Sequence, residues 1–284
     1  MKLNTIKVCS WFFSVCTTIA LISCQPDEFG DGNGLSDPNV NASFTVTPID
    51  GEINKYLLEA ETENVLGVKW DFGFGAAFGN TIDTVFFPDA GEYTITLTAI
   101  GKGGMMNSTS QDVTVLTSDP NAGNLVVGGK MDEGDDSNWE FVTYSAGVSS
   151  SIAGGKMVFT GGGWGQSGIY QTVQVEGGKK YKVDMLVSGS GATDTWFEVY
   201  VGMAVPVPGS DYNDGGKRLA LNTWAGCAKT PFNGKLSVIS CDGTNGGVFT
   251  FEESGTAYLF IRGGGADLGT TGISIDNVEL RGTK

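Results

Sequence analysis

The sequence contains no histidine. Histidine is the general base of Ser-His-Asp and Cys-His nucleophile systems and a ligand in most zinc and copper sites. Its absence excludes these catalytic systems and nearly all sites for those two metals.

Positive charge is also scarce. The 284 residues include 17 Lys and Arg against 32 Asp and Glu, which gives a formal net charge of −15. So acidic a chain repels nucleic acid and anionic lipid headgroups. We therefore expect no nucleic-acid partner.

Long helical windows rich in Ala, Leu, Glu and Lys are missing as well. The chain has instead 44 glycines and short β-branched runs such as SFTVTPI, YTITLTAI, YKVDMLV and WFEVYVGM. Alternation of apolar and polar residues is typical of strands that bury one face, and clusters of Gly, Asn and Asp between the runs are typical of turns. The sequence predicts an all-β protein with two domains.

The N-terminus has the proportions of a secretory signal, because two lysines precede an apolar run over 8–22. This run is too short for a comfortable transmembrane helix, which needs about 20 apolar residues. It ends in Leu-Ile-Ser-Cys at 21–24, which resembles the bacterial lipobox, whose cysteine is acylated. We expect a lipoprotein signal peptide over 1–23 and lipidation of Cys24; an ordinary signal peptide with an incidental cysteine is the alternative.

The segment 24–41 is rich in Gly, Asp and Asn and has no periodicity, as a flexible tether requires. The acids directly behind Cys24 resemble the export signal of surface lipoproteins in Bacteroidetes-type bacteria. This resemblance implies a lipid anchor in the outer membrane, with the protein facing the exterior.

Five cysteines are present. Cys9 and Cys16 would leave with the signal peptide, and Cys24 would take the lipid. The remaining Cys227 and Cys241 are an even pair in an exported protein, which predicts a disulfide.

Residues 42–117 contain strand-like runs that include VKWDFGFG and AGEYTITLTA. They resemble a PKD (polycystic kidney disease) domain, in which the Trp-Asp-Phe-Gly-Asp-Gly hallmark appears here with Phe74 in place of the second Asp. The resemblance implies an immunoglobulin-like sandwich, which we interpret as a spacer. Trp70 alternates with Phe72, so we expect it in the core. A linker follows at 118–122.

Residues 123–284 begin with NLVVGGKMDEGDDSNWEF, continue with SGIYQTVQVEGGKKYKVDMLVSGS and end with GTAYLFIRGGGADLGTTGISIDNVEL. These stretches resemble jelly-roll carbohydrate-binding modules of the galactose-binding-like type. With the lipobox and the PKD-like spacer, the whole is similar to a surface glycan-binding protein of a Sus-type polysaccharide utilisation locus, laminarin or β-glucan type. The resemblance implies a jelly-roll β-sandwich that captures a polysaccharide, with a Sus-type transporter complex as a further partner.

Three tryptophans have no expected place in a core. Trp164 lies in TGGGWGQSG, which we expect to be a loop, and Trp224 lies in LNTWAGC beside the predicted disulfide. In DTWFEVYVG the alternation predicts that Trp196 points away from the core, together with the carboxylate and tyrosine that follow it.

Aromatic rings stack on the C–H faces of sugars while polar groups bond the hydroxyls, so these side chains predict a carbohydrate site. For any single tryptophan, core packing is the alternative. The expected site comprises three exposed platforms and nearby polar groups: Trp164, Trp196, Trp224, Glu198, Tyr200, Asn222 and Arg262.

Calcium is implied by the same resemblance. Such modules hold a structural Ca²⁺ through acidic oxygens after the first strand and on the last strand, and Asp132 and Asp276 match those positions. Ordinary turn acids are the alternative.

A jelly roll can also be a glycoside hydrolase or a lyase. Hydrolysis needs two carboxylates, and neither a clustered Glu-x-Asp-x-x-Glu strand nor an acid two positions from Glu198 is present. A lyase would usually need histidine. A protein-binding adhesin is a third class, which would present a wider apolar patch than isolated tryptophans. The sequence favours non-catalytic capture of a polysaccharide, with laminarin-type β-1,3-glucan first.

Overall fold

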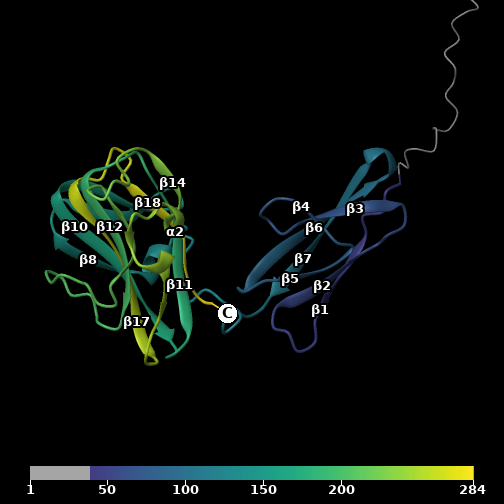
Figure 1. Cartoon of the computed structure of the whole chain (residues 1–284), viewed down its shortest axis with the longest axis horizontal. Coiled ribbons are helices and arrows are strands. Elements are labelled where there is room, and N and C mark those ends of the chain that lie inside the picture. Colours follow the sequence, from purple (N-terminus) through teal and green to yellow (C-terminus); the bar gives the residue numbers. More distant parts are fainter. Residues whose placement is uncertain (1–38, 284) are drawn as a thin grey trace, which may run out of the picture. The chain divides into compact units, whose positions relative to one another are not determined.

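The computed structural model describes residues 39–283, which are nearly all β-strand and turn (Figure 1). The predicted signal peptide, Cys24 and most of the tether lie outside the described residues. The all-β prediction is confirmed. No helix within the described part of the chain is long and apolar enough to cross a membrane.

Two compact units divide the chain. The first comprises the described residues up to Thr47 with Leu57–Thr84 and Thr94–Asp112, and the second comprises Pro48–Tyr56, Val85–Tyr93 and the chain from Val113 onward. The division cuts through the ends of several strands. The boundaries 42–117 and 123–284 therefore stay predictions.

Seven strands between residues 44 and 115 form two sheets, β1-β2-β5 and β4-β3-β6-β7, with a short 3₁₀ turn η1. Two such sheets are the arrangement of an immunoglobulin-like sandwich. Trp70 is only 3% exposed and its indole N–H donates to the carbonyl of Asn80, which confirms its core position. The elements are β1 (Phe44–Pro48), β2 (Lys55–Ala60), β3 (Val65–Asp71), β4 (Ala77–Gly79), β5 (Ile82–Phe86), β6 (Gly91–Gly101), η1 (Lys102–Gly104) and β7 (Met106–Val115).

The remaining strands belong to one curled sheet that folds into a sandwich. Three short helical turns interrupt the connections. The elements are η2 (Asp135–Asn138), β8 (Glu140–Ser145), β9 (Val148–Ile152), β10 (Met157–Val175), β11 (Lys180–Gly189), β12 (Thr193–Gly202), β13 (Lys217–Asn222), β14 (Phe232–Lys235), α2 (Leu236–Ile239), β15 (Asp242–Gly243), η3 (Asn245–Gly247), β16 (Val248–Thr250), β17 (Gly255–Asp267) and β18 (Ile273–Gly282).

The long strand β10 serves both layers of this sandwich. Its first residues pair with β9 and β18, and its residues after the glycine run pair with β8 and β17. Strands that pass from one sheet to another through a bulge form the corners of such sandwiches. The core lies between the two layers, where Phe159 and Phe197 meet edge to face at 5.4 Å.

Strand β12 shows the predicted alternation. Phe197, Val199 and Val201 belong to the buried core cluster. Trp196 and Glu198 therefore lie on the opposite face of the layer formed by β13, β12, β17, β10 and β8. This face, turned away from the core, carries the candidate site.

Candidate functional site

The structure brings Trp164, Trp196 and Trp224 into one stack. The ring centroids of Trp164 and Trp224 lie 6.4 Å apart with an interplanar angle of 21°, and those of Trp224 and Trp196 lie 6.3 Å apart at 27°. We call these three side chains the tryptophan platform. Trp164 is 60% exposed and Trp224 55% exposed, but Trp196 is partly buried, so the prediction of three exposed rings is wrong for Trp196.

Trp164 does not lie in a loop, which corrects the prediction from sequence. It lies within β10, at the point where the strand changes layers and its register with β17 shifts between Gly162 and Gly165. Added Cβ atoms there would lie 2.1 Å and 2.5 Å from backbone oxygens of β17 and of the turn between β8 and β9, so the neighbouring backbone requires glycine at both positions. The φ of Trp164 is 66°, a left-handed conformation that bulky side chains rarely adopt. A bulge of this kind turns a side chain outward.

The indole of Trp196 packs against backbone that carries no side chain. It stands opposite Gly264 of β17 and Asn222 of β13 in the strand register. A Cβ atom added at Gly264 would lie 2.6 Å from Cζ2 of Trp196, which means that the indole covers this glycine. The close approach explains why Trp196 is partly buried.

Trp224 sits in the turn that follows β13. The side-chain oxygen of Asn222 accepts the backbone N–H groups of Trp224 at 2.9 Å and of Ala225 at 3.3 Å, as in an Asx turn. The predicted cysteine pair is joined, with an S–S distance of 2.01 Å between Cys227 and Cys241. Asn222 thus acts on the backbone that positions Trp224, and the disulfide closes the segment behind it.

A chain of alternating charges crosses the same face. It consists of Asp242, Lys217, Glu198, Arg262 and Asp211, and we call it the ion-pair chain. Lys217 donates to Asp242 and lies 3.3 Å from Oε1 of Glu198, and the guanidinium of Arg262 lies 2.8 Å both from Oε2 of Glu198 and from Oδ1 of Asp211.

The ion-pair chain is linked to the platform through Asn222, whose side-chain amide donates to Asp242 at 3.3 Å. The three residues Lys217, Asp242 and Asp211 were not among the site residues predicted from sequence. They come from separate segments, and only the strand register, which sets Glu198 opposite Arg262, points to such a pairing.

The predicted polar residues Glu198, Tyr200 and Arg262 are buried, with 8%, 4% and 6% exposure. They bond one another: the Tyr200 hydroxyl donates to Glu198 at 3.0 Å and accepts from Arg262 at 3.0 Å. Burial and the Glu198 carboxylate raise the pKa of the Tyr200 phenol. The Tyr200 ring packs against Tyr212 and Phe260 in a satellite cluster. These groups form a rigid floor beside the platform.

The two outer carboxyls of the ion-pair chain are held ionised. The hydrogen bond from Lys217 lowers the pKa of Asp242, and the hydrogen bond from Arg262 lowers the pKa of Asp211, against smaller opposing effects of burial. A glycosidase acid needs a carboxyl with a raised pKa. Asp211 and Asp242 have the opposite property, so neither is suited to protonate a leaving group.

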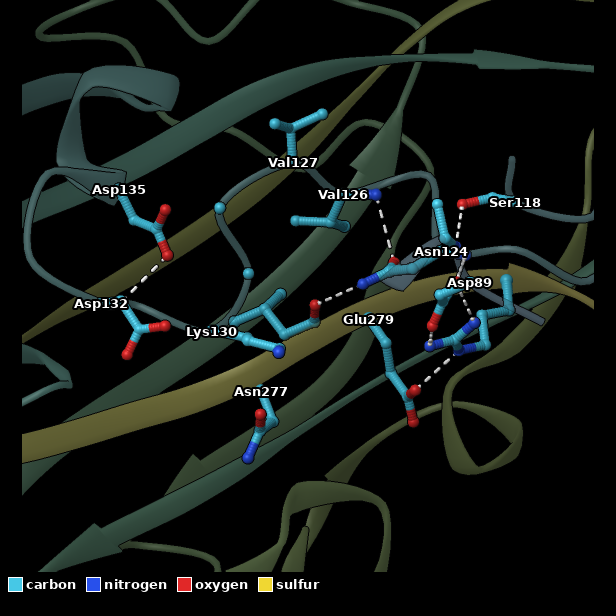
Figure 2. A pocket seen from close by; sticks show the side chains of 15 residues that line it. Asp89, Ser118, Asn124, Val126, Val127, Lys130, Asp132, Asp135, Asn277 and Glu279 are labelled. Carbon is cyan, nitrogen blue, oxygen red and sulfur yellow. Dashed lines mark hydrogen bonds and ion pairs between the residues drawn. The ribbon is translucent and has the colours of Figure 1, made fainter. Parts of the chain in front are cut away.

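The predicted calcium ligands lie elsewhere. Asp132 lines a cavity of about 470 Å³ within the second unit, where its backbone N–H donates to Asp135 at 2.9 Å (Figure 2). Asp276 is not part of that lining, and its carboxylate accepts the N–H of Asn277 at 2.6 Å. Within residues 39–283 no three His, Cys, Asp or Glu side chains gather closely enough to hold a metal ion. Asp132 and Asp276 thus belong to no cluster of three such side chains in this part of the chain, and the calcium stays a prediction.

The same cavity contains a tight ion pair. Two nitrogens of Arg281 lie 2.9 Å and 2.6 Å from the two carboxylate oxygens of Asp89, and Asn124 donates its backbone N–H to the same carboxylate. Burial raises the pKa of Asp89, but the bonds from Arg281 and Asn124 together outweigh it and lower the value. Figure 2 shows Asp89 and Glu279 in this part of the lining.

Neither a protein-family model nor a curated protein matches the chain. Among solved structures, a carbohydrate-binding module of the β-sandwich superfamily is 16% identical, with 86% of this chain and 99% of that chain covered and a TM-score of 0.31. A structure described as CBM4 is 14% identical, with coverages of 56% and 99% and a TM-score of 0.35. The enzymatically active domain of tailspike protein 4 from bacteriophage CBA120 is 14% identical, with coverages of 56% and 21% and a TM-score of 0.38.

Proposed function

We propose that the protein binds a polysaccharide on the tryptophan platform without cleaving it. The stack of Trp164, Trp224 and Trp196 carries this proposal. Two of these rings are more than half exposed, although covering an aromatic ring is worth about 1.5–3 kcal/mol. Exposed aromatic groups that share one surface mark binding sites, and the C–H faces of pyranose rings are a fitting cover.

Non-catalytic binding is supported by the groups beside the platform. Glu198 is engaged by two cations, and the carboxyls of Asp211 and Asp242 are held ionised by Arg262 and Lys217. Hydrolysis of a glycosidic bond requires one carboxyl that carries a proton and a second that is free to attack or to activate water. The ion-pair chain is better suited to holding the platform rigid.

Laminarin-type β-1,3-glucan is the ligand that we propose first. The interplanar angles of 21° and 27° mean that the rings of the platform turn with respect to one another. A chain that curves can lie against each ring in turn, whereas a flat ribbon is better matched to coplanar rings.

The cellular setting is a proposal that rests on the sequence resemblance. Cys24 would anchor the protein by lipid in the outer membrane, facing the exterior, and the PKD-like segment would act as a spacer. Many anchored copies would bind one polymer with avidity, and a Sus-type transporter complex would take it up.

The proposal is tested by Trp164→Ala and Trp224→Ala, each assayed by calorimetry and by affinity gels with laminarin, xylan and alginate. Loss of one ring face should weaken laminarin binding by about 1–3 kcal/mol, and the thermal transition should hardly move because both side chains are largely exposed. Phe74→Ala is the matched control, since Phe74 is an aromatic ring with 96% exposure in the first unit.

Unchanged affinity in a Trp164→Ala/Trp224→Ala double variant would refute the site. If the protein binds xylan or alginate but not laminarin, and the double variant loses this binding, the proposed ligand is wrong and the proposed site stands.

A further inference from the structure

We propose that the platform selects uncharged polysaccharides and rejects anionic ones, even when the sugar backbone is the same. This inference rests on the proposed function and names the ligand class of the same site. It follows from how the charges around the platform are paired.

Both cations of the ion-pair chain are already engaged. Lys217 lies between Glu198 and Asp242, and Arg262 lies between Glu198 and Asp211. The side chain of Arg262 is 8% exposed and that of Glu198 is 10% exposed. A ligand sulfate or carboxylate could recruit either cation only by breaking one of these pairs. Taking a cation from Glu198 would remove one of the two charges that pair with this buried carboxylate, which is unfavourable.

Two exposed carboxylates, which we call the platform rim, lie beside the platform in the sequence or in the strand register. Asp194 stands two residues before Trp196, and Asp267 pairs in register with Gly162, two residues before Trp164. Both side chains belong to exposed residues, and neither pairs with a cation in the part of the chain that the structure describes. Lys229, five residues after Trp224, is an exposed cation on the same segment.

The balance around the platform is therefore negative. Three cations, Lys217, Arg262 and Lys229, stand against the three carboxylates of the ion-pair chain and the two aspartates of the rim. The net charge of −15 on the whole chain adds to this field. A polyanion would bring many like charges to this surface, and like-charge contacts oppose association. A neutral glycan meets no such penalty.

The test compares laminarin with chemically sulfated laminarin, which share one backbone, by calorimetry at low and at high salt. Laminarin affinity should be indifferent to salt. Sulfated laminarin should bind at least about tenfold more weakly at low salt, and the difference should shrink as salt shortens the Debye length to about 3 Å at 1 M.

Asp194→Asn/Asp267→Asn should raise the affinity for sulfated laminarin at low salt and leave that for laminarin unchanged. Glu61→Gln/Glu63→Gln is the matched control, because it changes the total charge equally at two exposed residues of the first unit. An equal gain in the control would overturn the assignment of selectivity to the platform rim.

Two further outcomes separate this inference from the proposed function. Sulfated laminarin that binds as tightly as laminarin, with both lost in Trp164→Ala/Trp224→Ala, would overturn the selectivity and leave the binding site standing. Failure of neutral and anionic glycans alike to bind would refute the proposed function, and the selectivity with it.

Discussion

Replacing Gly264 by alanine tests how the platform is built without removing any of its rings. The φ of Gly264 is not in the left-handed region, so alanine suits the backbone conformation. The added Cβ atom would, however, lie 2.6 Å from Cζ2 and 2.9 Å from Cε2 of Trp196, and 2.9 Å from the carbonyl oxygen of Gly165. Carbon atoms in contact prefer about 3.5–4.0 Å, so the indole must swing outward by about 1 Å.

The displacement should disturb the contact between Trp196 and Trp224, whose centroids now lie 6.3 Å apart. An aromatic pair contributes about 0.5–1.5 kcal/mol beyond its buried area, which corresponds to about a two- to twelvefold change in the population of the ordered stack. We expect laminarin affinity to fall by about the same factor. The free energy of unfolding should fall by about 1–3 kcal/mol, because the added methyl group also crowds the backbone oxygen of Gly165.

The neighbouring position provides a matched control. A Cβ atom at Gly263 points to the opposite face and would meet Cδ2 of Phe197 at 3.4 Å, an ordinary contact. Calorimetry with laminarin measures the affinity, and circular dichroism of the coupled indoles reports the stack without ligand. Gly264→Ala binding as tightly as Gly263→Ala, with an altered dichroism signal, would show that the position of Trp196 does not matter for binding. An unaltered dichroism signal would refute the claim that contact with Gly264 sets the position of the Trp196 ring.

Three further predictions concern the disulfide, the ion-pair chain and the anchor. Thiol titration of the unreduced, unfolded protein should find neither Cys227 nor Cys241 free, and Cys227→Ser/Cys241→Ser should lower the free energy of unfolding by about 3 kcal/mol, given a sequence separation of 14. The pKa of Asp242 is lowered from 3.8, so the ionised carboxylate stabilises the fold fully above pH 3.8, and this stabilisation is lost as the pH falls through the pKa of the folded state. The Asp242→Asn variant should therefore be less stable than the original protein at neutral pH and should lose less stability on acidification. Urea titrations from pH 7 downward measure both effects. Cys24→Ala should release the protein from the membrane fraction; a variant that stays membrane-bound and hidden from protease on whole cells would contradict the lipid anchor.

Local patterns in the sequence determined the class of fold and identified many of the residues that form the site. Alternation in DTWFEVYVG separated the core side of β12 from the side that bears Trp196, and this depends only on the period of two in a strand. Cys227 and Cys241 were predicted to pair because they are the two cysteines left in an exported protein, and the structure joins them. The tryptophans outside the core could be recognised in the sequence, because they lie among glycines or at positions of a strand that point away from the core.

Pairing of distant strands decided the rest. The run around Trp164 could be taken for a loop, because glycines mark turns and crossing strands alike, and only the neighbours of β10 distinguish the two. Trp224 and Trp164 lie far apart in the sequence, yet their rings stack, because β17 and β12 bring β10 and the turn after β13 into one layer. Glu198 and Arg262 looked like ligands for sugar hydroxyls, but their register places them opposite each other, where burial makes an ion pair the only inexpensive arrangement. Such contacts depend on register between strands, and register depends on the packing of the whole sandwich rather than on any local run of residues.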